Sequence, residues 1–97
     1  IRKDEYKTTH VGKGASIGAN ATIVCGNPLG AFCLIGAGAV ITKPVAPYAL
    51  MVGNPAKQIG WVSEFGHRLH FDENNQAICA ESLQEYVLSN AQVSRVK

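Results

Sequence analysis

The sequence is poor in charged and aromatic residues, which make up 16% and 7% of its 97 residues. Nine Lys and Arg residues stand against seven Asp and Glu, so the formal net charge is only +2, and no run of like charge exceeds two residues. Proteins that bind nucleic acid or anionic membrane surfaces usually carry basic stripes or blocks. We therefore expect no nucleic acid and no membrane among the partners of this chain.

Long apolar runs are also missing from the sequence. No stretch approaches the ~18 consecutive apolar residues that cross a bilayer, and the opening segment IRKDEYKTTH has no apolar core of a signal peptide. The three cysteines, Cys25, Cys33 and Cys79, are odd in number and have no CxxC spacing. This pattern argues against a disulfide framework or a zinc ribbon. The sequence thus predicts a cytoplasmic chain with reduced thiols.

What the sequence does have is an aliphatic residue at every sixth position. The series is Val11, Ile17, Ile23, Leu29, Ile35 and Ile41. Gly usually follows each member, and the fourth residue after it is usually small, as at Ala15, Ala21, Cys33 and Ala39. Hexad repeats are typical of a parallel β-helix. The period does not match the 3.6 residues of an α-helix turn or the period-two pattern of hairpin strands.

Three hexads make one triangular coil, so residues eighteen apart should stack on one another. We expect each aliphatic residue to fill an interior corner and the small residue after it to point inward. The Gly that follows each aliphatic residue is expected to relieve the backbone where one face bends into the next. Asn27-Pro28 departs from the pattern, and because proline has no ladder donor it predicts a distortion or a small outward loop.

The sequence therefore predicts an all-β fold: a left-handed parallel β-helix of the hexapeptide-repeat kind, with two coils and a small C-terminal β cap. Residues 1–10 are expected to form an opening loop, 11–57 the coils and an exit strand, and 58–97 the cap.

Several finer expectations concern the exit from the coils and the cap. Pro44-Val45-Ala46-Pro47 breaks the period, Tyr48 to Val52 reads as a final strand, and residues 53–56 read as a turn that leads the chain away from the coils. A helical turn is expected at 61–66. Short strands are expected around 68–71, 77–79, 85–88 and 93–96.

Two coils are few for a repeat protein, which generally needs three or more units to bury a continuous core. We therefore expect that further coils precede Ile1 in the natural protein. A small protein that is complete in itself and trimerises is the alternative.

Several segments carry a family resemblance. The run IGAGAVITK (35–43), followed by Pro47-Tyr48-Ala49 and VGNPAK (52–57), resembles the C-terminal signature of hexapeptide-repeat acetyltransferases. QIGWVSEFGHRLHF (58–71) is similar to the tail of bacterial UDP-2-acetamido-3-amino-2,3-dideoxyglucuronate N-acetyltransferases, which serve surface-polysaccharide synthesis. The segments RKDEYKTT and ASIGANATIVCG fit the same subfamily.

This resemblance implies a homotrimer that holds acetyl-CoA in a groove between neighbouring prisms. It places Ala19 and Ala37 at outward corners, where their backbone would meet the pantetheine arm. Thr42 and Lys43 would lie farther along the groove, with Lys43 facing the CoA phosphates as a point charge, and Lys57 would lie near the adenosine end. Pro44 stands where an acidic residue is common. The family's catalytic residues and UDP-sugar contacts lie upstream of Ile1, so no catalytic residue is assigned.

For the histidines and Trp61 we expect structural or surface roles and no part in catalysis or metal binding. We expect His10 to be an exposed loop residue and not a catalytic base. His67 and His70 have no third ligand nearby, so we expect them to pack in the cap and to bind no metal. Trp61 is expected to fasten the cap to the coils.

Two functions from different classes stay open. The first is an acetyl-CoA-dependent N-acyltransferase that acts on a nucleotide-linked amino sugar, with this chain as its C-terminal part. The small residues at 19 and 37 and the two lysines favour it. The second is a non-catalytic structural or trimerising β-helix module that has lost the catalytic coils.

Overall fold

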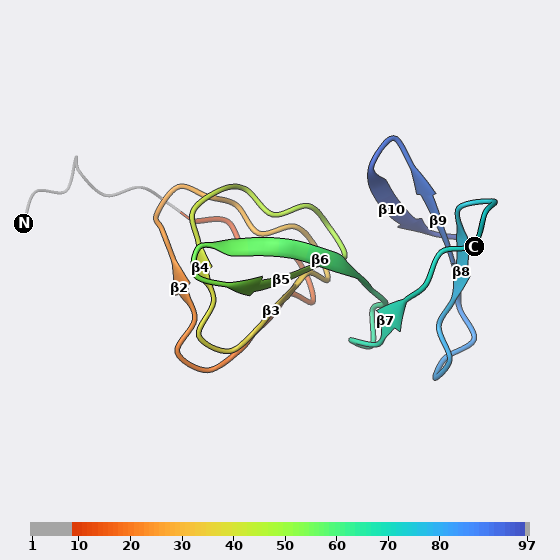
Figure 1. Ribbon diagram of the computed structural model, residues 1–97, viewed down its shortest axis with the longest axis horizontal. Helices are drawn as coiled ribbons and strands as arrows, with labels where there is room; N and C mark the ends of the chain where they lie inside the picture. Colours follow the sequence, from red (N-terminus) through yellow and green to blue (C-terminus); the bar gives the residue numbers. More distant parts are fainter. Residues whose placement is uncertain (1–8, 97) are drawn as a thin grey trace, which may run out of the picture.

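The computed structural model describes residues 9–96. Every regular element in this range is a β-strand, and no α-helix occurs within it, as Figure 1 shows. The strands are β1 (Ser16–Ile17), β2 (Thr22–Ile23), β3 (Leu34–Ile35), β4 (Val40–Ile41), β5 (Ala49–Gly53), β6 (Ala56–Val62), β7 (Arg68–Leu69), β8 (Gln76–Ile78), β9 (Glu85–Ser89) and β10 (Gln92–Arg95). The predicted all-β class is confirmed.

The hexads stack in parallel, with the predicted spacing of eighteen residues. β1 pairs with β3 through Ile17 and Ile35, β2 pairs with β4, and Val11 forms a bridge with Leu29. The next step is sixteen residues, from Leu29 to Val45. The chain thus passes repeatedly through three parallel ladders, and the last passage is shortened by two residues between Ile41 and Val45.

Three corners join the ladders: residues 12–15 and 30–33 form the first corner, 18–21 and 36–39 the second, and 24–28 and 42–44 the third. A residue with positive φ recurs at every sixth position in these corners, at Gly14, Asn20, Gly26, Phe32 and Gly38. The next position in the series is Pro44, whose ring fixes φ near −65°. Pro44 cannot adopt the conformation of the other corners, which explains why this passage is shorter.

The glycines that follow the aliphatic residues do a different job from the one expected. Gly12, Gly18, Gly30 and Gly36 are not among the residues with positive φ. They lie where the next passage of backbone comes close: a Cβ on Gly18 would stand 2.6 Å from the amide nitrogen of Ala37. These glycines therefore allow successive passages of the backbone to stack closely. The chain bends at the residues two positions later, which have positive φ.

The interior of the coils is filled as predicted. Leu29, Ile35 and Ile41 are buried, as are the small inward residues Cys33 and Ala39. Burial raises the pKa of the Cys33 thiol, in keeping with an inert core residue. In the first passage the aliphatic positions are more open, and Val11 is 53% exposed.

The outward loop expected at Asn27-Pro28 does not form. The ladder resumes at once, since the Leu29 amide donates to the His10 carbonyl and the Val45 amide donates to the Pro28 carbonyl. Pro28 lacks a donor, but its carbonyl still joins the ladder. The Asn27 side chain donates to the Val24 carbonyl at 2.8 Å and closes the corner.

The exit from the coils differs from the prediction. The turn at 53–56 is present, with a cis Asn54-Pro55 bond, but β6 folds back and pairs antiparallel with β5. This return provides hydrogen-bond partners for the outer edge of β5, which would otherwise be exposed. The helical turn expected at 61–66 is wrong, because β6 continues to Val62 and pairs with β7.

The cap, which is the chain after β6, lies beyond the parallel ladders, at the right of Figure 1. Its three-stranded antiparallel sheet has the order β10-β9-β8, and the four segments expected as strands are observed close to their predicted positions. Trp61 packs against both the interior of the coils and the cap cluster, as predicted. The described part of the chain measures 49 × 23 × 21 Å.

Part of the predicted opening loop, residues 1–8, lies outside the described residues. Within the described residues no helix has the length and hydropathy needed to span a membrane.

Candidate functional site at the second and third corners

The second corner has small side chains and an open backbone. Ala19 and Ala37 precede β2 and β4 and lie in successive passages, and the Gly38 amide donates to the Ala19 carbonyl at 2.9 Å. Both alanines are exposed. A Cβ added to Gly38 would have no heavy atom within 4 Å. The surface here is therefore open to a ligand that approaches the main chain.

Lys57 lies beside the same corner. It pairs with Val52 across the β5–β6 hairpin. Val52 in turn lies directly over Gly36, where an added Cβ would be 2.9 Å from the Val52 side chain. The structure thus places exposed Lys57 one strand beyond Val52, on the edge of the sheet nearest the residue that precedes Ala37.

Thr42 and Lys43 lie at the opposite end of the two-stranded sheet formed by β2 and β4. They follow β4 directly, at the third corner, and both are exposed. The five predicted cofactor residues therefore form two groups, with β2 and β4 between them. Six residues of chain separate Ala37 from Lys43, which at ~3.3 Å each gives a span of at most about 20 Å. A ligand that contacts both groups must follow β4 from one end to the other.

The histidines are surface residues, and none of them belongs to a candidate metal site within the described part of the chain. His10 is exposed, as predicted, but His67 and His70 are exposed as well, so their expected packing in the cap is wrong. Alternation along β7 turns Leu69 into the cap and leaves its neighbours in solvent. Among the described residues no group of three or more His, Cys, Asp or Glu side chains is placed to hold a metal ion.

A polar network that sequence reasoning missed joins the cap to the coils. The Tyr48 hydroxyl donates to one Glu64 carboxylate oxygen at 3.0 Å, and Arg95 contacts the other at 3.0 Å. The Glu64 amide donates to the Tyr86 hydroxyl at 3.0 Å. Burial, together with the neighbouring Glu64 carboxylate, raises the pKa of Tyr48 to about 12. We call Tyr48, Glu64, Tyr86 and Arg95 the Glu64 network.

An aromatic stack supports this network. The rings of Phe32 and Tyr48 are stacked with centroids 5.5 Å apart, and Tyr86 meets Tyr48 edge to face at the same distance. Phe32 and Tyr48 both have positive φ, which is unusual for bulky side chains. Phe32 could have been noticed in the sequence, because it takes the corner position that Gly14 and Gly38 hold in other passages.

Cys79, whose environment the sequence left undefined, is also part of the cap interior. Its thiol donates to the Ser63 hydroxyl at 3.2 Å, and Ser63 accepts hydrogen bonds from the amides of Phe65 and His67. Both Cys79 and Ser63 are buried. These contacts fix the turn between β6 and β7.

No protein-family model matches the sequence. Among curated proteins, the chain is 46% identical over 76 residues to a dTDP-3-amino-3,6-dideoxy-α-D-galactopyranose 3-N-acetyltransferase from Aneurinibacillus thermoaerophilus, covering 78% of this chain and 39% of that protein. It is 40% identical over 55 residues to serine acetyltransferase 4 from Arabidopsis thaliana, covering 57% of this chain and 16% of the relative. The chain thus spans well under half the length of these relatives.

Solved structures give the same picture. A hexapeptide-repeat acetyltransferase from Vibrio cholerae, solved with acetyl coenzyme A, matches with a TM-score of 0.57 and 28% identity, over 59% of this chain and 31% of that one. A serine acetyltransferase from Neisseria gonorrhoeae matches with a TM-score of 0.55 and 38% identity, over 57% of this chain and 22% of that one. The homologues of this chain are acetyltransferases, and the resemblance predicted from its sequence is confirmed at the level of the hexapeptide-repeat acetyltransferases.

Proposed function

We propose that the whole protein is an acetyl-CoA-dependent N-acyltransferase that acts on a nucleotide-linked amino sugar, and that this chain is its C-terminal part. The observation that carries the proposal is the 46% identity, over 76 residues, to an enzyme named for acetylating the 3-amino group of a dTDP-linked sugar. The subfamily that the sequence resembles also has a 3-amino sugar on a nucleotide as its substrate. The UDP-linked glucuronate derivative and the role in surface-polysaccharide synthesis are the finer part of the proposal.

The proposed architecture is two coils of a left-handed β-helix over residues 11–57, preceded by an opening loop at 1–10 and followed by a β cap at 58–97. The parallel ladders and the similarity to solved hexapeptide-repeat acetyltransferases support it. We further propose a cytoplasmic homotrimer that binds a UDP-amino sugar and neither nucleic acid nor membrane.

Acetyl-CoA is proposed to lie along β2 and β4, between the second and third corners. Ala19 and Ala37 let the pantetheine arm reach the backbone, since neither carries a side chain beyond Cβ. Thr42 and Lys43 lie at one end of this surface and Lys57 at the other. Each lysine supplies a point charge for phosphate. An extended cofactor that follows β4 would contact both groups of residues.

The reaction is a nucleophilic acyl transfer. The sugar amine attacks the thioester carbonyl to form a tetrahedral intermediate, whose nitrogen gives up a proton. The carbon–sulfur bond then breaks, and the CoA thiolate leaves and takes up a proton to become the free thiol. Such a step needs a base and a donor that stabilises the oxyanion. We assign neither role to a residue of this chain. The contribution proposed for its corners is to hold the cofactor.

The test is calorimetric titration of the chain with acetyl-CoA, with light scattering to give the oligomeric state. Lys43→Ala should weaken binding about fivefold, because an exposed charge–phosphate contact is worth about 1 kcal/mol. Lys13→Ala is the matched control: Lys13 is also exposed but belongs to the first corner. A folded oligomer that binds no acetyl-CoA would favour the trimerising module. Equal binding by both variants would remove Lys43 from the proposed groove.

A further inference from the structure

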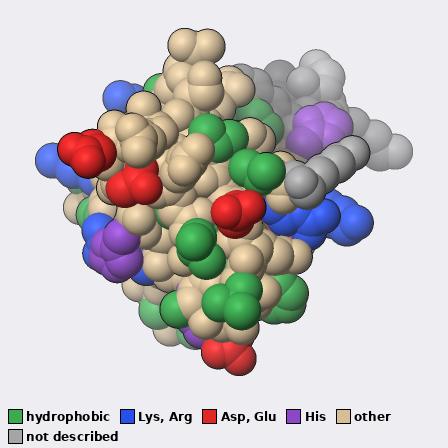
Figure 2. All heavy atoms as spheres, turned by 90° about the vertical axis from the view of Figure 1, so that its right-hand side faces the viewer, with side chains coloured by type: hydrophobic (Ala, Val, Ile, Leu, Met, Phe, Trp, Pro, Cys, Tyr) green, Lys and Arg blue, Asp and Glu red, His purple; other side chains and the backbone are tan. Residues whose placement is uncertain are grey.

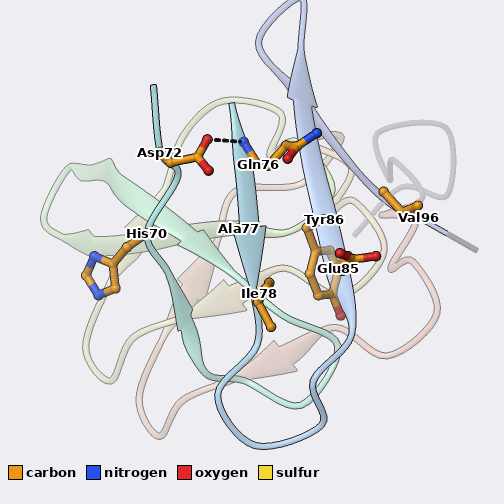
Figure 3. A pocket seen from close by; sticks show the side chains of 8 residues that line it. All are labelled: His70, Asp72, Gln76, Ala77, Ile78, Glu85, Tyr86 and Val96. Atoms are coloured by element: carbon orange, nitrogen blue, oxygen red, sulfur yellow. Dashed lines mark hydrogen bonds between the residues drawn. The ribbon is translucent and has the colours of Figure 1, made fainter. Parts of the chain in front are cut away.

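A cavity of about 310 Å³ lies in the cap, away from the second and third corners. Figure 3 shows how its residues are arranged: His70 and Asp72 come from the segment after β7, Gln76 and Ile78 from β8, Glu85 from β9, and Val96 follows β10. The size is at the lower end for small-molecule pockets, which run from about 300 to 1,000 Å³. Nothing in the proposed acetyl transfer uses this cavity.

The sequence of the cap sheet explains its chemistry. Strand alternation turns Ala77 and Tyr86 to the buried face, so Ile78 and Glu85, which are paired neighbours, face outward. The Val96 amide donates to the Glu85 carbonyl at 2.8 Å and brings a second aliphatic side chain to the same face. Ile78 is 61% exposed and Val96 44% exposed. The cavity therefore offers an aliphatic surface beside a carboxylate.

A second carboxylate of the cavity lining, that of Asp72, is held in place by backbone amides. Asp72 Oδ1 accepts hydrogen bonds from the amides of Asn74 at 2.8 Å and Gln76 at 3.0 Å, and the Asp72 amide donates to the Gln76 carbonyl. These three contacts fix the carboxyl group at the start of β8. The second oxygen of Asp72 has no hydrogen bond within the described chain.

The charge of the cavity selects its ligand. The described residues that line it include Asp72 and Glu85 but no Lys or Arg, although the chain as a whole carries a net charge of +2. Figure 2 looks onto the cap end and shows hydrophobic side chains exposed among acidic ones. Carboxylates attract an ammonium group, and the aliphatic side chains suit a hydrocarbon body next to it.

We infer that this cavity binds a small organic molecule that carries a protonated amine on an aliphatic ring or arm. The inference is independent of the proposed acetyl transfer, which concerns the coils. Because both carboxylates are solvent-exposed, each contact is weak, and affinity for a simple amine falls in the millimolar range.

The test is an NMR titration of the full chain at pH 7 and constant ionic strength, with cyclohexylammonium chloride as the probe and cyclohexanol as its neutral counterpart. The amides of Ile78, Glu85 and Val96 should shift in a saturable way with the ammonium only. Glu85→Gln should weaken binding about threefold. Glu73→Gln removes the same charge from an exposed residue outside the cavity lining and should leave binding unchanged.

Two results would overturn the inference. One is equal shifts with cyclohexanol, which would show apolar adsorption without charge recognition. The other is equal affinity in the Glu85 and Glu73 variants, which would show a diffuse response to net charge. Neither result bears on acetyl-CoA binding by the coils, so the failure of one proposal can be distinguished from that of the other.

Discussion

Replacing Glu64 by Gln should loosen the cap from the coils. The substitution keeps the size of the side chain but removes its negative charge. The Glu64 carboxylate accepts the hydrogen bond of the Tyr48 hydroxyl at 3.0 Å and contacts Arg95 at 3.0 Å. Glu64 is 18% exposed, and a hydrogen bond to a charged group there is worth about 1.5–3 kcal/mol. Arg95 is 39% exposed, so its contact adds only about 0–1 kcal/mol. A weaker bond to the amide remains, which gives an expected net loss of about 2 kcal/mol.

Thermal unfolding measures this loss directly. For a chain of this length about 1 kcal/mol corresponds to 4–8 °C, so we expect the midpoint to fall by about 10 °C. Glu73→Gln removes the same charge at an exposed position and is the control. It should cost at most about 0.5 kcal/mol, which lowers the midpoint by no more than about 2–4 °C.

A double-mutant cycle isolates the hydrogen bond itself. Tyr48→Phe removes the hydroxyl but keeps the ring that stacks on Phe32. Once Glu64 is Gln, this second change should cost about 1 kcal/mol less than it does in the native chain. Strictly additive effects, or a Glu64→Gln variant as stable as the control, would refute the reasoning.

Three further predictions concern the coils and the pH. Ile35→Ala should destabilise the fold by about 2–5 kcal/mol in urea unfolding, because Ile35 is buried, whereas Ile17→Ala at a 46% exposed position should cost under about 1 kcal/mol. Gly18→Ala should lower the free energy of unfolding by about 1–3 kcal/mol, because the added Cβ would press on the Ala37 amide. Gly38→Asn should lower it by under about 1 kcal/mol, because Gly38 lies in open space and asparagine tolerates its positive φ. Equal losses in the two variants would contradict the stacking role of Gly18. The pKa of Tyr48 is raised from 10 to about 12 in the folded state, so the neutral hydroxyl stabilises the fold fully below pH 10. This contribution to the free energy of unfolding, about 3 kcal/mol, is lost as the pH rises from 10 to 12. Tyr48→Phe should flatten this decline in stability with pH, and an unchanged pH profile in the variant would contradict the role given to Tyr48.

The coils were predictable because the information is local and repeated. An aliphatic residue every six positions fixes which residues stack, and the ladders follow that spacing through Ile17 and Ile35. The role of the neighbouring glycines was not predictable in the same way. Their need for space comes from another passage of the chain, as with Gly18 against Ala37, and the spacing alone gives no distance between passages.

The exit and the cap depend on contacts between distant residues. Gly, Asn and Pro at 53–56 predict a turn, but they do not specify where the chain goes after it. The direction of the chain is set by the pairing of β6 with β5. Glu64 contacts residues that lie sixteen, twenty-two and thirty-one positions away, and no periodic pattern connects them. The candidate cofactor residues came from family resemblance, and their division between two corners emerged only from the structure.

The most direct test of the proposed cofactor surface is acetyl-CoA binding by an Ala37→Leu variant. Ala37 is exposed at the second corner, so the larger side chain should cover the backbone there without disturbing the core. Ala80→Leu, at an exposed position of the cap, is the matched control. We predict that calorimetry will show at least an approximately tenfold loss of affinity, about 1.4 kcal/mol, in the first variant and native affinity in the second. Native affinity in both variants would contradict the assignment of the acetyl-CoA groove to this corner.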